Sequence, residues 1–287
     1  EQWLRAAMTS GGGDQRLDGR LVPSSDRDPL LPRLADELGR DVLSRVIVGA
    51  RDILIVAPAA TLLGTVVGTA LGLVTGYFRG PVDDILSRFI DAILALPTVI
   101  IGLLAIVALG TSKLTVIIVI GLVFAPIIAR TVRAAVLQER EMDYVAAAQL
   151  RNEKAPYILF AEILPNVMGP VMVEFTVRLG YAIFTVATLS FLGFGIQPPA
   201  PDWGLQVFEH YGLISGGYWW PVLFPAAAIA TLVIGVLIYG DAFGTSGYSS
   251  QPHMSYAVAE GVTLFVFLAG VSALLVWMLG RREEAIH

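Results

Sequence analysis

Few residues of this sequence have the types and spacing that catalysis or metal binding requires. The chain has no cysteine, which excludes disulfides, thiolate zinc sites and cysteine nucleophiles. His210, His253 and His287 are scattered, whereas a metal site needs several converging ligands. The three glycines at 11–13 lack the Gly-Lys-Ser/Thr that completes a phosphate-binding loop, and no Gly-x-Ser-x-Gly or His-Glu-x-x-His pattern occurs. We therefore expect no catalytic residue, no cofactor and no metal site in this chain.

Two ionisable residues stand inside an otherwise apolar run. Glu174 and Arg178 lie four residues apart. Charged side chains in such a run are costly in lipid and often functional, so the pair could line a translocation path. Alternatively, the two side chains form a mutual ion pair near the cytoplasmic end of their helix. The spacing of four favours the ion pair, because residues at i and i+4 meet on one helix face.

The composition indicates that lipid surrounds much of the chain. Of the 287 residues, 55% are hydrophobic and 15% charged, and the mean hydropathy is +0.71. Soluble domains carry about 25% charged residues. The net charge of -5 comes from a few loops. No basic stripe with interleaved aromatic residues occurs, so we expect no nucleic-acid partner.

Long apolar runs predict helices that cross a bilayer, each needing about 20 mostly apolar residues. Lys and Arg concentrate in 79–88 and 137–167, which places these two loops in the cytoplasm and 196–220 outside. Charged and apolar residues alternate at helical spacing over 37–50, which predicts an amphipathic helix along the outer interface. The expected spans, six in number, are 53–78, 89–110, 114–136, 168–195, 221–243 and 256–279.

The loop 137–167 is too long for a simple connector between membrane helices. Its first part, 143–150, is rich in helix-forming residues and begins with Asp143. A second run begins at Pro156 and is expected to end at Pro165-Asn166. Two short helices with small residues on one and apolar residues on the other would form a projection that docks into a groove of a cytoplasmic partner.

This loop resembles the coupling motif of ABC importer permeases. The family pattern is Glu-Ala-Ala, a glycine some residues later, and then Ile-Leu-Pro-Asn. The chain keeps the spacing but has Ala146 in place of the glutamate and Asn152 in place of the glycine, and asparagine is the next best residue for a left-handed turn. The residues that the resemblance assigns to ATPase coupling are Asp143, Ala146, Ala147, Ala148, Asn152, Ile163, Leu164, Pro165 and Asn166.

Two further stretches narrow the resemblance to the dipeptide, oligopeptide and nickel importers. Residues 36–45 (Asp-Glu-Leu-Gly-Arg-Asp-Val-Leu-Ser-Arg) are similar to the segment before the second membrane helix of that group. Residues 190–204 (Ser-Phe-Leu-Gly-Phe-Gly-Ile-Gln-Pro-Pro-Ala-Pro-Asp-Trp-Gly) are similar to its outer-face segment. The resemblance runs over about 36–243 and implies the second permease subunit, the C component.

From this resemblance we expect an all-α, polytopic membrane protein with the MetI-like helical bundle of type I ABC importer permeases and a cytoplasmic coupling-helix loop. It would lie in the plasma membrane and move di- or oligopeptides. The implied partners are a second, homologous permease, two cytoplasmic ATP-binding subunits that bind the ATP and Mg, an extracytoplasmic substrate-binding protein and the lipid bilayer.

The sequence predicts three regions. Residues 1–50 form an extracytoplasmic N-terminal segment, 51–243 the permease domain, and 244–287 a linker plus an extra membrane helix without a counterpart in the family. Because 1–50 lies outside with no span before it, we expect a first helix upstream of Glu1. The alternatives are a nickel importer permease, an ion-coupled secondary transporter, and a non-transporting or degenerate membrane scaffold.

Overall fold

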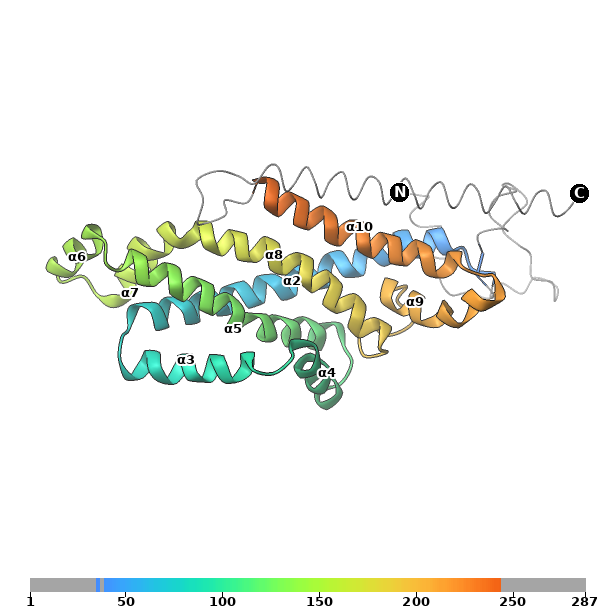
Figure 1. Cartoon of the computed structure of the whole chain (residues 1–287), viewed down its shortest axis with the longest axis horizontal. Helices are drawn as coiled ribbons and strands as arrows, with labels where there is room; N and C mark the ends of the chain where they lie inside the picture. Colours follow the sequence, from blue (N-terminus) through green and yellow to red (C-terminus); the bar gives the residue numbers. More distant parts are fainter. Residues whose placement is uncertain (1–34, 37–38, 244–287) are drawn as a thin grey trace, which may run out of the picture.

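The computed structural model describes residues 35–36 and 39–243. These residues form an elongated bundle of helices whose long members run side by side (Figure 1). Apart from one antiparallel bridge between Ala35 and Asp41, every element in the described ranges is helical. The expected all-helical membrane architecture is confirmed.

Four helices are long and apolar enough to cross a membrane. They correspond to the predicted first, third, fourth and fifth spans, while the predicted span 256–279 lies outside the described residues. Long apolar runs predict such helices because only a helix satisfies its own backbone hydrogen bonds in lipid. The four are α2 (Val42–Tyr77), α5 (Lys113–Glu139), α8 (Leu164–Phe191) and α10 (Trp220–Phe243).

The predicted span over 89–110 is not a single helix. The chain forms α3 (Pro81–Leu94) and α4 (Thr98–Leu109), which meet at an angle of 89° (Figure 1). The break falls at Pro97, whose ψ of 122° is extended and which caps α4. A proline pushes the residue before it out of the α region, so a helix usually ends just ahead of it.

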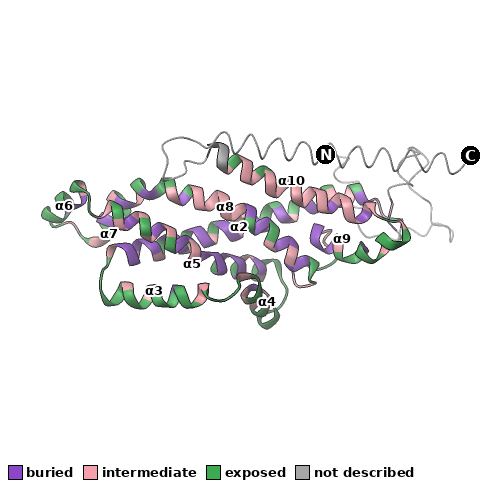
Figure 2. Ribbon diagram, viewed as in Figure 1, coloured by how far each residue is buried: buried purple, intermediate pink, exposed green. Residues whose placement is uncertain are grey.

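Helices α2 and α5 form the centre of the bundle, where the buried residues gather (Figure 2). Four glycines at intervals of four residues bring the α2 backbone onto α5. A Cβ atom added at Gly72 would lie 2.7 Å from Val132 Cβ, and one added at Gly76 would lie 2.6 Å from Val136 Cβ. Small residues permit such close helix packing in membranes. The glycines are Gly64, Gly68, Gly72 and Gly76.

The expected interfacial helix over 37–50 is not a separate element. Residues 42–50 are the first turns of α2, so the predicted domain boundary between 50 and 51 falls inside that helix. Asp41 caps α2, because its carboxylate accepts a 3.0 Å hydrogen bond from the Leu43 N–H. Residues 42–50 are helical, as their periodicity predicts, but they continue directly into the spanning helix.

The two sets of loops lie at opposite ends of the bundle (Figure 1). At one end, Arg79 forms an ion pair with Glu141, which joins the two loops predicted to be cytoplasmic. At the other end lie α9 (Trp203–His210) and η3 (Tyr211–Gly216), and Lys113 pairs with Asp52 at 2.6 Å. This arrangement agrees with the sidedness that the Lys and Arg distribution predicts.

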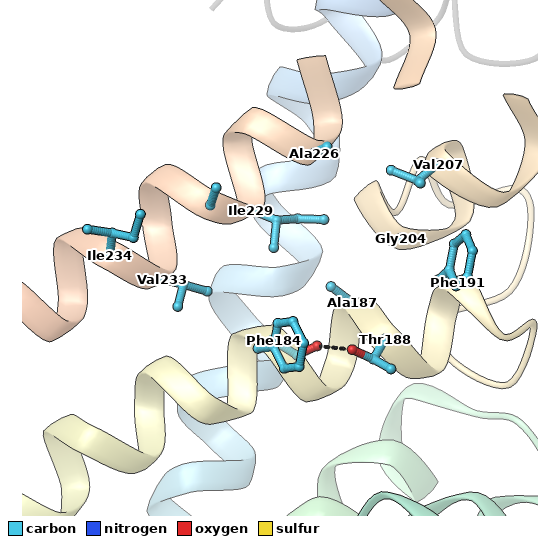
Figure 3. A pocket seen from close by; sticks show the side chains of 11 residues that line it. Phe184, Ala187, Thr188, Phe191, Gly204, Val207, Ala226, Ile229, Val233 and Ile234 are labelled. Atoms are coloured by element: carbon cyan, nitrogen blue, oxygen red, sulfur yellow. Dashed lines mark hydrogen bonds between the residues drawn. The ribbon is translucent and has the colours of Figure 1, made fainter. Parts of the chain in front are cut away.

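A cavity of about 440 Å³ opens between α8, α9 and α10 (Figure 3). Its lining is almost wholly apolar, with Phe184 and Phe191 from α8, Val207 from α9, and Ile229 and Val233 from α10. The outer helix α9 therefore shares this cavity with two of the spanning helices.

Candidate functional site: the loop between α5 and α8

The first helix of the loop is α6 (Asp143–Leu150), with the bounds that the sequence predicts. It ends in a turn around Asn152, whose φ is +58°. The Asn152 N–H donates to the Gln149 carbonyl at 2.9 Å, and the Glu153 N–H donates to the Ala148 carbonyl at 3.2 Å. These are the two hydrogen bonds of a Schellman motif. The predicted left-handed conformation of Asn152 is confirmed.

The sequence predicts that the second helix of the loop ends at Pro165-Asn166, but in the structure it continues beyond these residues. The α-helical turn α7 (Ala155–Tyr157), the π-helical stretch η2 (Ile158–Ile163) and α8 follow one another without a break. Within this run the Leu164 N–H donates to the carbonyl of Leu159, five residues back. A π-helical turn lets the helix continue through a proline, which has no N–H to donate. Residues 155–191 therefore form one helical run.

Apolar side chains on the inner side of the loop join it to the core. Val145 and Ala148 of α6 are fully buried, and so are Ile158 and Ile163 of η2. All four belong to the same buried cluster as the spanning helices. The loop is thus packed onto the bundle and does not swing free of it.

The outer side of the loop exposes an apolar surface, which we call the apolar tip and define as Ala146, Ala147, Leu150, Tyr157 and Phe160. Leu150 is 86% exposed and Phe160 is 61% exposed. Large exposed apolar side chains that lie close together mark interaction sites. The family motif pointed to the two alanines but not to the three larger residues. The spacing of Tyr157 and Phe160, three apart on a helix, was the signal in the sequence that could have identified them.

Polar contacts fix the shape of the loop around this tip. Arg151 lies 3.0 Å from Glu162, which joins the turn after α6 to η2. The Tyr144 hydroxyl donates to the Glu139 carboxylate at 2.7 Å. Burial and the nearby Glu139 carboxylate raise the pKa of Tyr144 to about 12, so this hydroxyl keeps its proton and remains a donor at neutral pH.

Most of the remaining predicted coupling residues lie at the surface. Asp143 is exposed in the first turn of α6, where a negative charge suits the helix dipole. Leu164 is half-buried, and Pro165 is exposed. Asn166 is also exposed, and its side-chain amide donates to the Glu162 carbonyl at 2.8 Å. Asn166 therefore holds the helical run together at the π-helical stretch.

Glu174 and Arg178 lie in the central turns of α8 and not near its cytoplasmic end, because the helix begins earlier than the predicted span, at Leu164, and the helical run before it at Ala155. Arg178 Nε is 2.9 Å from the Glu174 carboxylate, the arrangement that their spacing favours. The Thr131 hydroxyl of α5 donates to the other Glu174 oxygen at 2.9 Å. The guanidinium also lies 5.2 Å from the centre of the Tyr181 ring. This network links α5 to α8.

A family of known proteins matches most of the helical bundle. The family model for the "binding-protein-dependent transport system inner membrane component" matches residues 68–246. That range contains the loop between α5 and α8, the last part of α2, and the whole of α5, α8 and α10.

Curated relatives extend the match. The chain is 37% identical over 206 residues to a dipeptide transport system permease protein DppC of Alkalihalophilus pseudofirmus, covering 72% of this chain and 67% of the relative. It is 36% identical over 207 residues to the oligopeptide transport system permease protein OppC of Bacillus subtilis, with 72% and 67% covered. It is 33% identical over 207 residues to the glutathione transport system permease protein GsiD of Pectobacterium atrosepticum, with 72% and 68% covered.

A solved structure shares the fold. A chain of the MetNI methionine ABC transporter, in an inward-facing conformation, superposes with a TM-score of 0.58 at 20% identity. The match covers 72% of this chain and 96% of that chain. The chain described here therefore belongs to the binding-protein-dependent transport system inner membrane components, the multi-pass, non-enzymatic permease subunits of ABC transporters in the plasma membrane.

Proposed function

We propose that this chain is a membrane subunit of an ATP-driven importer of di- or oligopeptides. Several relatives at 35–37% identity are named as dipeptide or di/tripeptide permeases, and one at 36% as an oligopeptide permease. The nickel alternative receives less support, because no group of three or more His, Cys, Asp or Glu residues in 35–36 and 39–243 could hold a metal ion.

The observation that carries the proposal is the unbroken helical run from Ala155 to Phe191. This run begins beside the apolar tip and ends at the opposite end of the bundle. An ATPase subunit bound to the tip would therefore push directly on a spanning helix. Transport would follow from a rigid-body switch between inward-open and outward-open arrangements.

The partners follow from this mechanism. Two cytoplasmic ATP-binding subunits supply the force, one through the apolar tip of this chain and the other through the equivalent loop of a second, homologous permease. Cargo arrives on an extracytoplasmic binding protein that docks over α9 and η3. ATP and Mg bind to the ATPase subunits, and this chain contributes position and movement.

The decisive experiment uses proteoliposomes that contain the chain, its partner permease, both ATPase subunits and the binding protein. We expect peptide-loaded binding protein to stimulate ATP hydrolysis and the uptake of labelled peptide. Nickel uptake without peptide uptake would contradict the proposed cargo. A complex that assembles but transports neither would contradict the importer itself.

A variant tests the role of the apolar tip. Phe160→Asp places a charge in the centre of the docking surface, and an interface residue of this kind contributes about 2 kcal/mol or more. We expect ATPase co-purification and peptide-stimulated hydrolysis to fall about tenfold or more. Val82→Asp is the matched control, because Val82 is 42% exposed at the same end of the bundle but outside the tip. Equal activity of the two variants would remove the tip from the mechanism.

A further inference from the structure

The outer helix α9 is fastened to the first turns of α2 by hydrogen bonds from its side chains. The Trp203 indole N–H donates to the Val46 carbonyl at 2.7 Å. The Gln206 amide donates to the Arg45 carbonyl at 3.3 Å and to the Pro201 carbonyl at 2.9 Å. These bonds use neutral groups, so their strength does not change with pH near neutrality.

His210, the last residue of α9, makes a different kind of contact. Its Nδ1 lies 2.7 Å from the Gln206 carbonyl oxygen, and its Nε2 lies 3.5 Å from the Asp36 carboxylate. Both side chains are buried, at 3% and 0% exposed. A carbonyl and an ionised carboxylate only accept hydrogen bonds, and a neutral imidazole carries a single N–H. Only the protonated ring places an N–H toward each of the two oxygens.

The charges around His210 keep Asp36 ionised. Arg40 Nε lies 2.6 Å from the Asp36 carboxylate, and Arg45 lies 3.5 Å from it. Burial opposes the negative charge on Asp36, but the facing His210 ring and the hydrogen bonds from Arg40 outweigh it, and they hold the pKa of Asp36 well below its usual range. Glu209 adds a second carboxylate, 3.1 Å from Arg45. The facing Asp36 carboxylate in turn raises the pKa of His210, against the opposing effect of burial.

Asp202, which caps the other end of α9, also has a raised pKa. One carboxylate oxygen accepts from the Leu205 N–H at 3.0 Å, while Oδ2 is buried without a hydrogen-bond partner among the described residues. Burial raises the pKa of Asp202 to about 6, and the negative charge of Asp52 on α2 acts in the same sense. Burial of Asp202 therefore costs more when the carboxyl is ionised than when it is protonated.

We propose that α9 is a proton-dependent latch, held against Asp36 and residues 40–46 in mildly acidic solution and released as the solution becomes alkaline. The contribution of His210 is complete below its ordinary pKa of 6.5 and is lost as the pH rises through the raised value. The contribution of Asp202 is lost between about 4 and about 6, also with rising pH. Asp36 acts oppositely and sets the lower limit, because its contribution disappears below its ordinary value of 3.8.

Release of α9 would reach the spanning helices. Gly204 of α9 packs so closely on α8 that an added Cβ would lie 2.1 Å from the Ala187 carbonyl oxygen. Val207 lines the cavity shared with α8 and α10 (Figure 3). Under the proposed orientation the latch lies on the outer face, where it senses the pH of the surroundings.

Hydrogen exchange of the full chain in lipid nanodiscs tests this inference without any transport assay. After correction for intrinsic rates, we expect the protection of the 203–210 amides to fall at least about threefold between about pH 6.5 and about pH 9, a range that starts at the ordinary pKa of histidine and extends above it. In His210→Gln this dependence should vanish, because the amide is neutral throughout. The matched control is His253→Gln, which removes another histidine of the chain and should leave the dependence intact.

Two results would overturn the latch. One is wild-type protection that does not change with pH, and the other is a pH dependence that survives in His210→Gln. Should that variant fail to fold, nuclear magnetic resonance of the His210 ring in the wild type decides the matter. A ring pKa above 6.5 that falls in Asp36→Asn supports the latch, and a ring pKa at or below 6.5 rules it out.

Discussion

Asn152 holds the turn after α6 with a backbone conformation that most side chains avoid. Among the residues in 35–36 and 39–243, it is the only non-glycine residue with a positive φ. Asparagine reaches this region more easily than other residues with a Cβ atom. The replacement of the family glycine by asparagine could therefore be interpreted from the sequence, since the turn requires a left-handed residue in either case.

The turn gives a prediction about stability. Asn152→Ala should lower the free energy of unfolding by about 1 kcal/mol, because the left-handed conformation costs an ordinary L-residue about that much. Asn152→Gly should leave stability equal or slightly higher. Thermal unfolding of the purified chain, followed by circular dichroism, measures both variants. If alanine and glycine behave alike, the turn is not under this constraint.

Other residue-level features could be predicted only in part. The pairing of Glu174 with Arg178 follows from their spacing, but the hydroxyl of Thr131 comes from a helix 43 residues earlier in the chain and no local pattern indicates it. Trp203 is similar. An aromatic residue in an outer segment is typical of the membrane interface, yet Trp203 is 5% exposed and joins α9 to α2.

Among the elements, prolines show why apolar runs predict the spanning helices better than the breaks between them. Pro58 and Pro126 lie inside α2 and α5, and both helices continue past them. Pro97 separates α3 from α4, while the helical run continues through Pro165. Neighbouring helices and local π-helical turns decide which outcome occurs. Those contacts are tertiary, so the sequence near each proline does not reveal them.

The packing of α2 on α5 gives a prediction at the scale of the helix pair. Gly72→Leu should prevent the close approach, because an added Cβ would already lie 2.8 Å from the Ala129 carbonyl oxygen. We expect little folded protein in the membrane fraction. Gly235→Leu is the control, since a Cβ at Gly235 of α10 meets nothing within 4 Å. Comparable yields of the two variants, measured by size-exclusion chromatography, would contradict the packing argument.

For the whole molecule, the continuity of residues 155–191 predicts how transport can be uncoupled. Two glycines inserted between Met168 and Gly169, beyond the Arg151–Glu162 ion pair that shapes the loop, should leave the apolar tip able to bind the ATPase subunit but interrupt the helical run, because glycine is a poor helix former. ATP hydrolysis should persist while peptide uptake falls at least about tenfold. Both are measured in the proteoliposomes described above.

The same insertion after Gly110, in the loop before α5, is the control and should leave uptake close to normal. Uptake that survives the first insertion would show that force reaches the membrane by another route. The sequence alone could not suggest this experiment. The family motif with its Pro165-Asn166 ending predicts a separate second helix, and only the structure shows the run that joins it to α8.

The glycine-lined contact of α2 with α5 also limits where motion can occur. Because α2 has no side chain at its four glycines, side chains and carbonyl oxygens of α5 lie directly against its backbone, and sliding one helix by a turn would drive a valine or a carbonyl oxygen into the other. These two helices therefore form a rigid pair. We therefore expect opening toward either side of the membrane to come from movement of α8 and α10 relative to this pair, so that their positions differ between inward-open and outward-open states.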